Sequence, residues 1–146
     1  MRAKVFVDAN IPMYAAGAEY PLKAPSLRVL EAAAKGQIAA VTDAEVLQEI
    51  MQRYASLDFR EKGAQVAELF LQVVPNVLPV TRENVVQALT LYRTYPEVQA
   101  RDTIHAAVMH SNGVMLIVTA DRHFDQFVGL QRVDPADFEG FLQEGC

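Results

Sequence analysis

The chain has 146 residues and a formal net charge of −5 at pH 7, with 51% hydrophobic and 21% charged residues. This length and composition are typical of one globular domain, which we expect to span residues 1–146. The acidic balance disfavours a simple nucleic-acid coat protein, which presents a basic face. It does not exclude an enzyme that acts on nucleic acid.

Other features of the chain predict a cytoplasmic protein. The single cysteine, Cys146, cannot form an intrachain disulfide, which favours a reducing compartment. Asp8 interrupts the apolar N-terminal stretch too early for the core of a signal peptide. No uninterrupted apolar run approaches the roughly 18 residues of a membrane span, so no membrane association is expected.

Short apolar runs alternate along the chain with segments whose apolar residues recur at helical spacing. The runs expected to form strands are 5–7, 37–41, 77–80, 114–118 and 130–133. The expected helices are 11–16, 26–35, a helix opened by the capping-box pattern Thr42–Glu45, 58–74, 82–92, 100–110, 123–128 and a C-terminal helix from Pro135. This alternation predicts an α/β fold with a central parallel sheet of about five strands and helices on both faces.

Local residue types refine this outline. Asn10 is placed to cap the helix 11–16. Pro79 indicates that the strand 77–80 is short or lies near an edge of the sheet, because proline cannot donate to a strand ladder. The run 114–118 is the most apolar in the chain and is therefore expected in the centre of the sheet.

Four acidic residues are placed where they could meet at one end of the sheet. Asp8 and Asp121 each follow an expected central strand, and ligands of open α/β sheets bind at the carboxyl ends of the strands. Asp102 lies in the first turn of its helix, and Glu49 lies about two turns into another helix. Two carboxylates roughly 4 Å apart repel by about 4 kcal/mol at an effective dielectric of about 20. Convergence of all four therefore requires protons or a hard divalent cation, and oxygen ligands favour Mg²⁺ or Mn²⁺.

The motifs that carry these acids resemble those of the PIN-domain ribonucleases, and in particular the VapC-type toxins of toxin–antitoxin pairs. The similar stretches occur in the same order and are 6–10, 41–50, 100–107 and 117–124. The resemblance implies a three-layer α/β/α fold, an acidic pocket that holds one or two Mg²⁺ or Mn²⁺ ions, and endonucleolytic cleavage of RNA.

Site residues follow from the resemblance position by position. The catalytic acids match Asp8, Glu49, Asp102 and Asp121, and the metal ligands match Asp8, Asp102 and Asp121. Asn10 and Thr119 match polar residues that line the pocket, and Asp125 matches an additional acid of many members.

The resemblance also implies a homodimer and a small antitoxin protein that places a segment in or near the acidic pocket. A groove for this partner is expected among apolar residues of the middle helices, namely Phe59, Phe70, Leu71 and Val74.

Structural explanations remain open for several of these side chains. Helix capping accounts for Asp43 and Glu45, and an exposed ion pair with Arg53 would account for Glu49. His105, three residues after Asp102, fits a packed or hydrogen-bonded histidine better than a metal ligand. The arginines beside two of the acids either steer phosphate or are solvated; they are Arg101 and Arg122.

Three functions are therefore compared. The leading hypothesis is a metal-dependent ribonuclease, and the second is a PIN-like module that binds RNA or protein without cutting. The third is a phosphoacceptor domain in which Asp8 is phosphorylated. That chemistry needs a lysine after a later strand, and no lysine follows Lys62.

Overall fold

The computed structural model describes residues 2–145, so Cys146 lies outside the described part of the chain. Five parallel strands form one sheet in the order β3-β2-β1-β4-β5. The strands are β1 (Lys4–Val7), β2 (Ala39–Asp43), β3 (Val77–Leu78), β4 (Leu116–Val118) and β5 (Gln131–Val133). The predicted fold class is confirmed.

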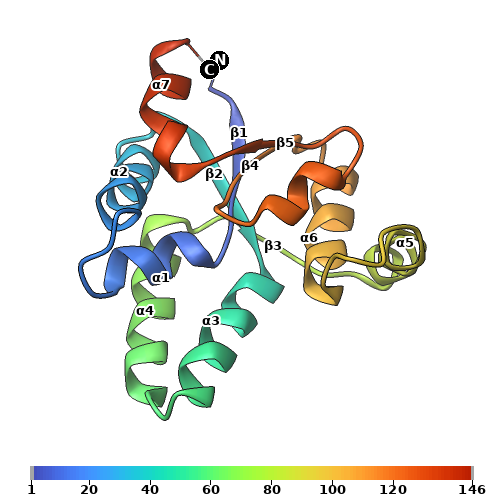
Figure 1. Ribbon diagram of the computed structural model, residues 1–146, viewed down its shortest axis with the longest axis horizontal. Coiled ribbons are helices and arrows are strands. Elements are labelled where there is room, and N and C mark those ends of the chain that lie inside the picture. The colour runs from blue at the N-terminus through green and yellow to red at the C-terminus, as the bar shows by residue number, and fades with distance from the viewer. Residues whose placement is uncertain (1, 146) are drawn as a thin grey trace.

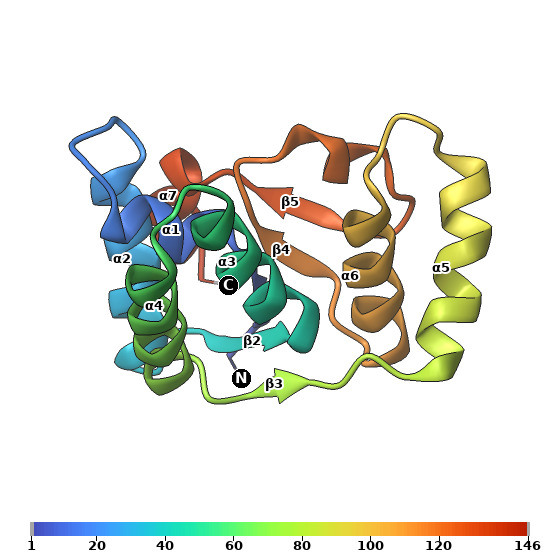
Figure 2. The same ribbon diagram turned by 90° about the horizontal axis from the view of Figure 1, so that it is seen from below.

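Helices cover both faces of this sheet and complete three layers (Figures 1 and 2). The α-helices are α1 (Asn10–Ala16), α2 (Lys23–Ala34), α3 (Ala44–Ser56), α4 (Arg60–Val73), α5 (Arg82–Thr94), α6 (Ala100–Ser111) and α7 (Phe138–Gln143). Two short 3-10 helices are η1 (Arg122–Gln126) and η2 (Pro135–Asp137). In both views α1, α2, α4 and α7 lie to one side of the sheet and α5 and α6 to the other.

The two central strands are buried on both faces, as their unbroken apolar sequences predict. The side chains of Val5, Phe6 and Val7 in β1, and of Ile117 and Val118 in β4, are fully buried. The register pairs Val7 with Val118, so both strands end at the same level. The residues that follow them, Asp8 and Thr119, therefore emerge side by side.

Several helix boundaries differ from the prediction for local reasons. Helix α2 begins at Lys23, three residues earlier than expected, because Pro25 is tolerated in a first turn, where its missing N–H costs nothing. Residues 123–128 were expected to form a helix, and the structure has the 3-10 helix η1 there. The edge position expected from Pro79 is confirmed, since β3 is the outermost strand.

Two expected caps are different in the structure. Asn10 does not cap α1; the capping position is Ala9, and the Asn10 side chain instead donates to Thr119 Oγ1 at 2.8 Å. The predicted capping box of Thr42 and Glu45 does not form, because Asp43 caps α3 instead by accepting from Val46 N at 2.9 Å. Thr42 is free of the cap and donates its hydroxyl to the carbonyl of Val7 at 3.1 Å, which joins β2 to β1.

Helix α5 packs on α6 at the outer side of the molecule (Figure 2). One face of α5 carries apolar side chains that are partly exposed. The exposed residues are Val85, Val86, Leu89 and Tyr92. They lie on the helix expected over 82–92, and residues 2–145 leave about half of each side chain exposed. None of the helices in the same range has the length and apolarity needed to cross a lipid bilayer.

Candidate metal and active site

The acidic site lies where the central strands end and is built from four elements. Asp8 follows β1, Asp121 follows β4, Glu49 projects from α3, and Asp102 projects from the first turn of α6. Ligand atoms of Asp8, Glu49 and His105 lie within 4.8 Å of one another, and those of Asp102, Asp121 and His123 form a second such group. The structure therefore brings the predicted acids into two groups and adds a histidine to each.

Asp8 is held in place by hydrogen bonds from the residues that follow it in the chain and from Thr119 at the end of the neighbouring strand β4. Its Oδ1 accepts from the backbone N–H of Ala9 at 2.8 Å. Its Oδ2 accepts from the Thr119 hydroxyl at 2.7 Å, and the amide of Asn10 lies 3.4 Å from the same oxygen. The predicted pocket-lining residues Asn10 and Thr119 thus orient the first acid.

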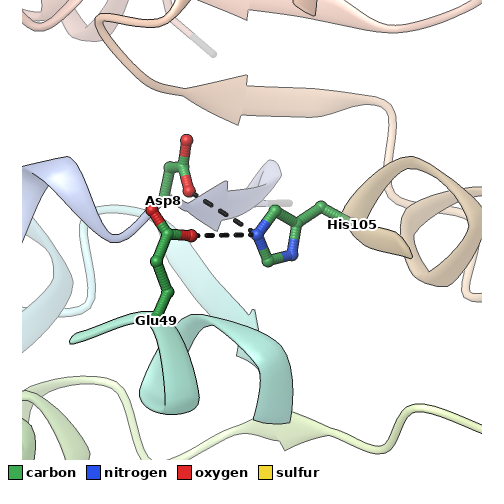
Figure 3. Close-up of side chains that lie close together, drawn as sticks. All are labelled: Asp8, Glu49 and His105. Atoms are coloured by element: carbon green, nitrogen blue, oxygen red, sulfur yellow. Dashed lines mark ion pairs between the residues drawn. The ribbon is translucent and has the colours of Figure 1, made fainter. Parts of the chain in front are cut away.

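His105 is completely buried beside Asp8 and Glu49 (Figure 3). Its Nδ1 lies 2.8 Å from Asp43 Oδ2, while its Nε2 faces Glu49 Oε1 at 3.5 Å and Asp8 Oδ1 at 3.9 Å. The aromatic rings of Phe6 and Phe124 pack against the imidazole, with ring centroids 5.4 Å and 6.4 Å away. The ring is therefore fixed in one orientation.

The second group surrounds the start of α6 and of η1. Asp102 is almost entirely buried, and its Oδ2 accepts from the backbone N–H of Gln99 at 3.2 Å. Asp121 caps η1 by accepting from the backbone of His123 at 2.9 Å, and the His123 ring nitrogen lies 3.1 Å from the same oxygen. The Thr119 hydroxyl accepts from Asp121 N at 3.1 Å and so links the two groups.

Burial and mutual repulsion raise the pKa values of two of these carboxyl groups. Burial raises the pKa of Asp8, and the neighbouring charge of Glu49 raises it further, while His105 opposes both. Burial followed by the charge of Asp121 raises the pKa of Asp102 to about 6. Burial alone would lower the pKa of His105, but the charge and hydrogen bond of Asp43 raise it well above its ordinary value.

An open pocket of about 300 Å³ gives solvent access to this edge of the sheet. Glu49 and Asp121 line it together with Asn10 and Arg101. The Arg101 guanidinium lies 3.3 Å from Glu49 Oε2, so Glu49 pairs with α6 rather than with Arg53 of its own helix. A substrate that enters here meets both the acids and a positive charge.

Two features of the site differ from the pattern expected from sequence. Asp125 is half exposed and its carboxylate binds Arg132 at 2.9 Å, so it belongs to neither acidic group. The Asp43–His105 pair was not predicted as part of the site, although a buried hydrogen-bonded His105 was. The signal available was the spacing of His105 from Asp102, which places both residues on one helix face.

A family model described as PIN domain matches residues 5–130. The chain belongs to the PIN domain family. It is 40% identical over 129 residues to the VapC ribonuclease Mb1869c of Mycobacterium bovis, covering 88% of this chain and 98% of that protein. It is 34% identical over 117 residues to Ribonuclease VapC23 of Mycobacterium tuberculosis, with 80% and 92% coverage.

Solved structures share the fold of this PIN domain at lower identity. VapC20 of Mycobacterium tuberculosis, described as a Sarcin-Ricin loop cleaving toxin, superposes with a TM-score of 0.70 at 20% identity, covering 86% of this chain and 98% of that one. VapBC2 from Rickettsia felis, bound to a DNA fragment from its promoter, superposes with a TM-score of 0.71 at 16% identity, covering 90% and 98%.

The donor set of this PIN domain fits a divalent cation. Carboxylate oxygens of Asp8, Glu49, Asp102 and Asp121 lie close together at the end of the central strands. Burial first, and then the charge of neighbouring carboxylates, raises the pKa values of Asp8 and Asp102. Within residues 2–145, the buried Oε1 of Glu49 accepts no hydrogen bond. Oxygen ligands in this arrangement suit Mg²⁺ or Mn²⁺.

Proposed function

We propose that this PIN domain is a metal-dependent endoribonuclease that hydrolyses RNA phosphodiester bonds at the acidic edge of its sheet. The observation that supports this most strongly is the position of four acids from four separate elements, which form two groups at the end of the central strands. One acid of each group, Glu49 and Asp121, lines the same open pocket. The curated relatives, named VapC ribonucleases, support the same activity. RNA as the substrate in turn supports a cytoplasmic location.

Each acid has a role in the proposed reaction. Asp8, Asp102 and Asp121 hold Mg²⁺ or Mn²⁺, and Glu49 acts beside them as the fourth catalytic acid. The bound ion supplies an activated water and charge stabilisation at the phosphate. Thr119 keeps Asp8 oriented through its 2.7 Å hydrogen bond, so the carboxylate is ready to bind without rearrangement.

Arg101 is suited to contact the substrate backbone. Its side chain lines the same pocket and is partly exposed, and its partner Glu49 is on the pocket wall. A phosphate entering the pocket gains an attraction to this guanidinium, whose planar donors match phosphate oxygens. The proposal gives Arg101 the role of positioning the substrate phosphate, one of the two alternatives left by the sequence.

We further propose that the protein is the toxin of a toxin–antitoxin pair, as the fold shared with VapBC complexes supports. An apolar groove of about 200 Å³ between α1, α2 and α4 suits an apolar segment of the antitoxin, and its lining includes Pro12, Leu27, Leu30, Val66, Leu69, Phe70 and Val73. Of the residues expected from sequence order, Phe70 lines this groove, whereas Val74 is buried in the core and Phe59 and Leu71 lie elsewhere.

We propose the exposed face of α5 as the homodimer interface. Its four apolar side chains are each between 42% and 54% exposed, which is costly for a helix surface that stays in water. Pairing with a second copy of the same face removes this area from solvent and leaves the acidic pocket open.

The test is cleavage of a mixed RNA pool in Mn²⁺, in Mg²⁺ and in EDTA. Asp102→Asn removes one acid of the site, and Asp137→Asn makes the same chemical change on an exposed residue outside it. We expect metal-dependent cuts by the wild type and by Asp137→Asn, and none by Asp102→Asn. Tight RNA binding without any cutting by wild-type protein, at Mn²⁺ concentrations where the metal is bound, would instead identify a non-cleaving binding module.

A further inference from the structure

In the buried imidazole of His105, Nδ1 is hydrogen-bonded to Asp43, whereas Nε2 has no hydrogen-bond partner in residues 2–145. Nδ1 lies 2.8 Å from Asp43 Oδ2, and a carboxylate buried at this position only accepts, so Nδ1 carries a proton. Nε2 is thereby the nitrogen directed at the acidic site, as Figure 3 shows. This hydrogen bond fixes both the orientation and the tautomer of a ring that is 0% exposed.

Nε2 of His105 and the carboxylate oxygen that faces it, Glu49 Oε1, both lack a hydrogen bond in the described part of the chain, although both are buried. Their separation is 3.5 Å, longer than the roughly 2.7–3.2 Å of a hydrogen bond in proteins. Buried polar atoms are almost always satisfied, so two adjacent unsatisfied atoms point to a ligand between them.

We propose that Nε2 of His105 is a ligand of a divalent transition-metal ion that Asp8 and Glu49 also bind. Two atoms that each lie about 2.1 Å from one ion are at most roughly 4.2 Å apart. The separations from Nε2 to Glu49 Oε1, 3.5 Å, and to Asp8 Oδ1, 3.9 Å, are within that limit. The inference rests on the proposed metal-dependent function, keeps Asp8 as a metal ligand, and adds Glu49 and the nitrogen of His105 as further ligands.

Asp43 is a positioning residue in this arrangement. Histidines that bind metals almost always donate their second ring N–H to a carboxylate or carbonyl, which fixes the ring and raises its basicity as a ligand. The Asp43–His105 hydrogen bond has this form, and Asp43 is itself fixed because its other oxygen caps α3. An imidazole ligand favours Mn²⁺ or another first-row transition metal over Mg²⁺, which prefers oxygen.

The competing arrangement is an imidazolium that carries protons on both nitrogens and pairs with the carboxylates facing it, which are Asp43, Glu49 and Asp8. Metal binding at Nε2 releases that proton to solvent, and the nitrogen lone pair then forms the bond to the metal. The exchange replaces one positive charge by two among these acids. The two arrangements differ in whether a bound metal contacts nitrogen, which spectroscopy measures directly.

Mn²⁺ bound to the full-length protein tests the proposal by pulsed electron paramagnetic resonance. We expect nitrogen modulation of the Mn²⁺ signal that changes when only the histidines are ¹⁵N-labelled. His123→Gln and His110→Gln should retain it, and His105→Gln should lose it. Bound Mn²⁺ without histidine coupling, or coupling that disappears in His123→Gln instead, overturns the proposal.

Asp43→Asn gives a second test in which His105 is kept. Asparagine is as good a helix cap as aspartate, so α3 should form normally. Its amide can donate to Nδ1, which then moves the ring proton to Nε2 and blocks metal binding there. We expect Mn²⁺ affinity by calorimetry to fall about 10- to 100-fold, the usual effect of removing such a partner. Unchanged affinity in a folded variant counts against the assignment.

The outcomes separate this inference from the proposed function. RNA cleavage in Mn²⁺ with no histidine coupling supports the proposed ribonuclease activity and shows that His105 is not a metal ligand. Histidine coupling in a protein that cleaves no RNA keeps the nitrogen ligand and removes the proposed activity.

Discussion

Replacing Asp102 by asparagine should stabilise the metal-free protein. The pKa of Asp102 rises from 3.8 to about 6 because the carboxyl is buried and faces Asp121. The folded state therefore holds the proton more tightly than the unfolded chain, and ionised Asp102 lowers the free energy of unfolding above pH 6. At 1.36 kcal/mol per pKa unit, the penalty is about 3 kcal/mol at pH 8. It shrinks as the pH falls through 6 and disappears below about pH 3.8.

The measurement is urea unfolding in EDTA at pH 8, 6 and 4. Asp102→Asn should unfold with a free energy about 3 kcal/mol higher than wild type at pH 8, and with nearly the same value at pH 4. The side-chain oxygen of asparagine still accepts from Gln99 N, so the start of α6 is preserved. Asp137→Asn, on an exposed residue, should differ little from wild type at any pH. Lower stability of Asp102→Asn at pH 8, or a difference independent of pH, would refute the claim that burial and the charge of Asp121 destabilise the ionised carboxylate.

Three other substitutions probe separate parts of the molecule. Thr119→Val removes the hydroxyl that donates to Asp8 at 2.7 Å. The rate of RNA cleavage should fall, and the free energy of unfolding measured in denaturant should fall by about 1–3 kcal/mol. Gly63→Ala places a Cβ 2.7 Å from the Cβ of Tyr54 where α3 and α4 meet, and should cost about 1–3 kcal/mol, seen as a lower melting temperature. Leu89→Glu should convert the proposed dimer to a monomer in light scattering while the melting temperature of a dilute sample stays the same; a persistent dimer would exclude the α5 face as the interface.

The sheet and the strand-end or helix-start positions of Asp8, Asp102 and Asp121 were predictable because their signals are local, whereas Glu49 was assigned to the site from the family resemblance. An apolar run that ends in an aspartate, such as Val5–Asp8, predicts a buried strand with a carboxylate at its carboxyl end. The first turn of a helix likewise favours a carboxylate such as Asp102 for its own reasons. Parallel strands then bring these local features to one edge without further information.

Contacts between distant elements were not predictable in the same way. Asp43 and His105 are 62 positions apart, and each has an adequate local explanation, one as a helix cap and the other as a packed ring. Glu49 pairs with Arg101 rather than the nearby Arg53 because α3 and α6 meet beside the pocket. Asn10 fails as a cap for a related reason, since Thr119 offers its side chain a partner that the sequence places 109 positions away.

The distance along the chain between Asp8 and Thr119 has a consequence for synthesis of the protein. Their hydrogen bond joins residues 111 positions apart, and β4, which sets their spacing, lies next to β1 in the sheet although most of the chain separates them. A ribosome that has made only the first hundred residues has therefore produced a chain that contains Asp8 and β2 but lacks β4. The acidic site comes into existence only after Thr119 and Asp121 have been added and β4 has paired with β1, so a chain that stops before these residues lacks the site.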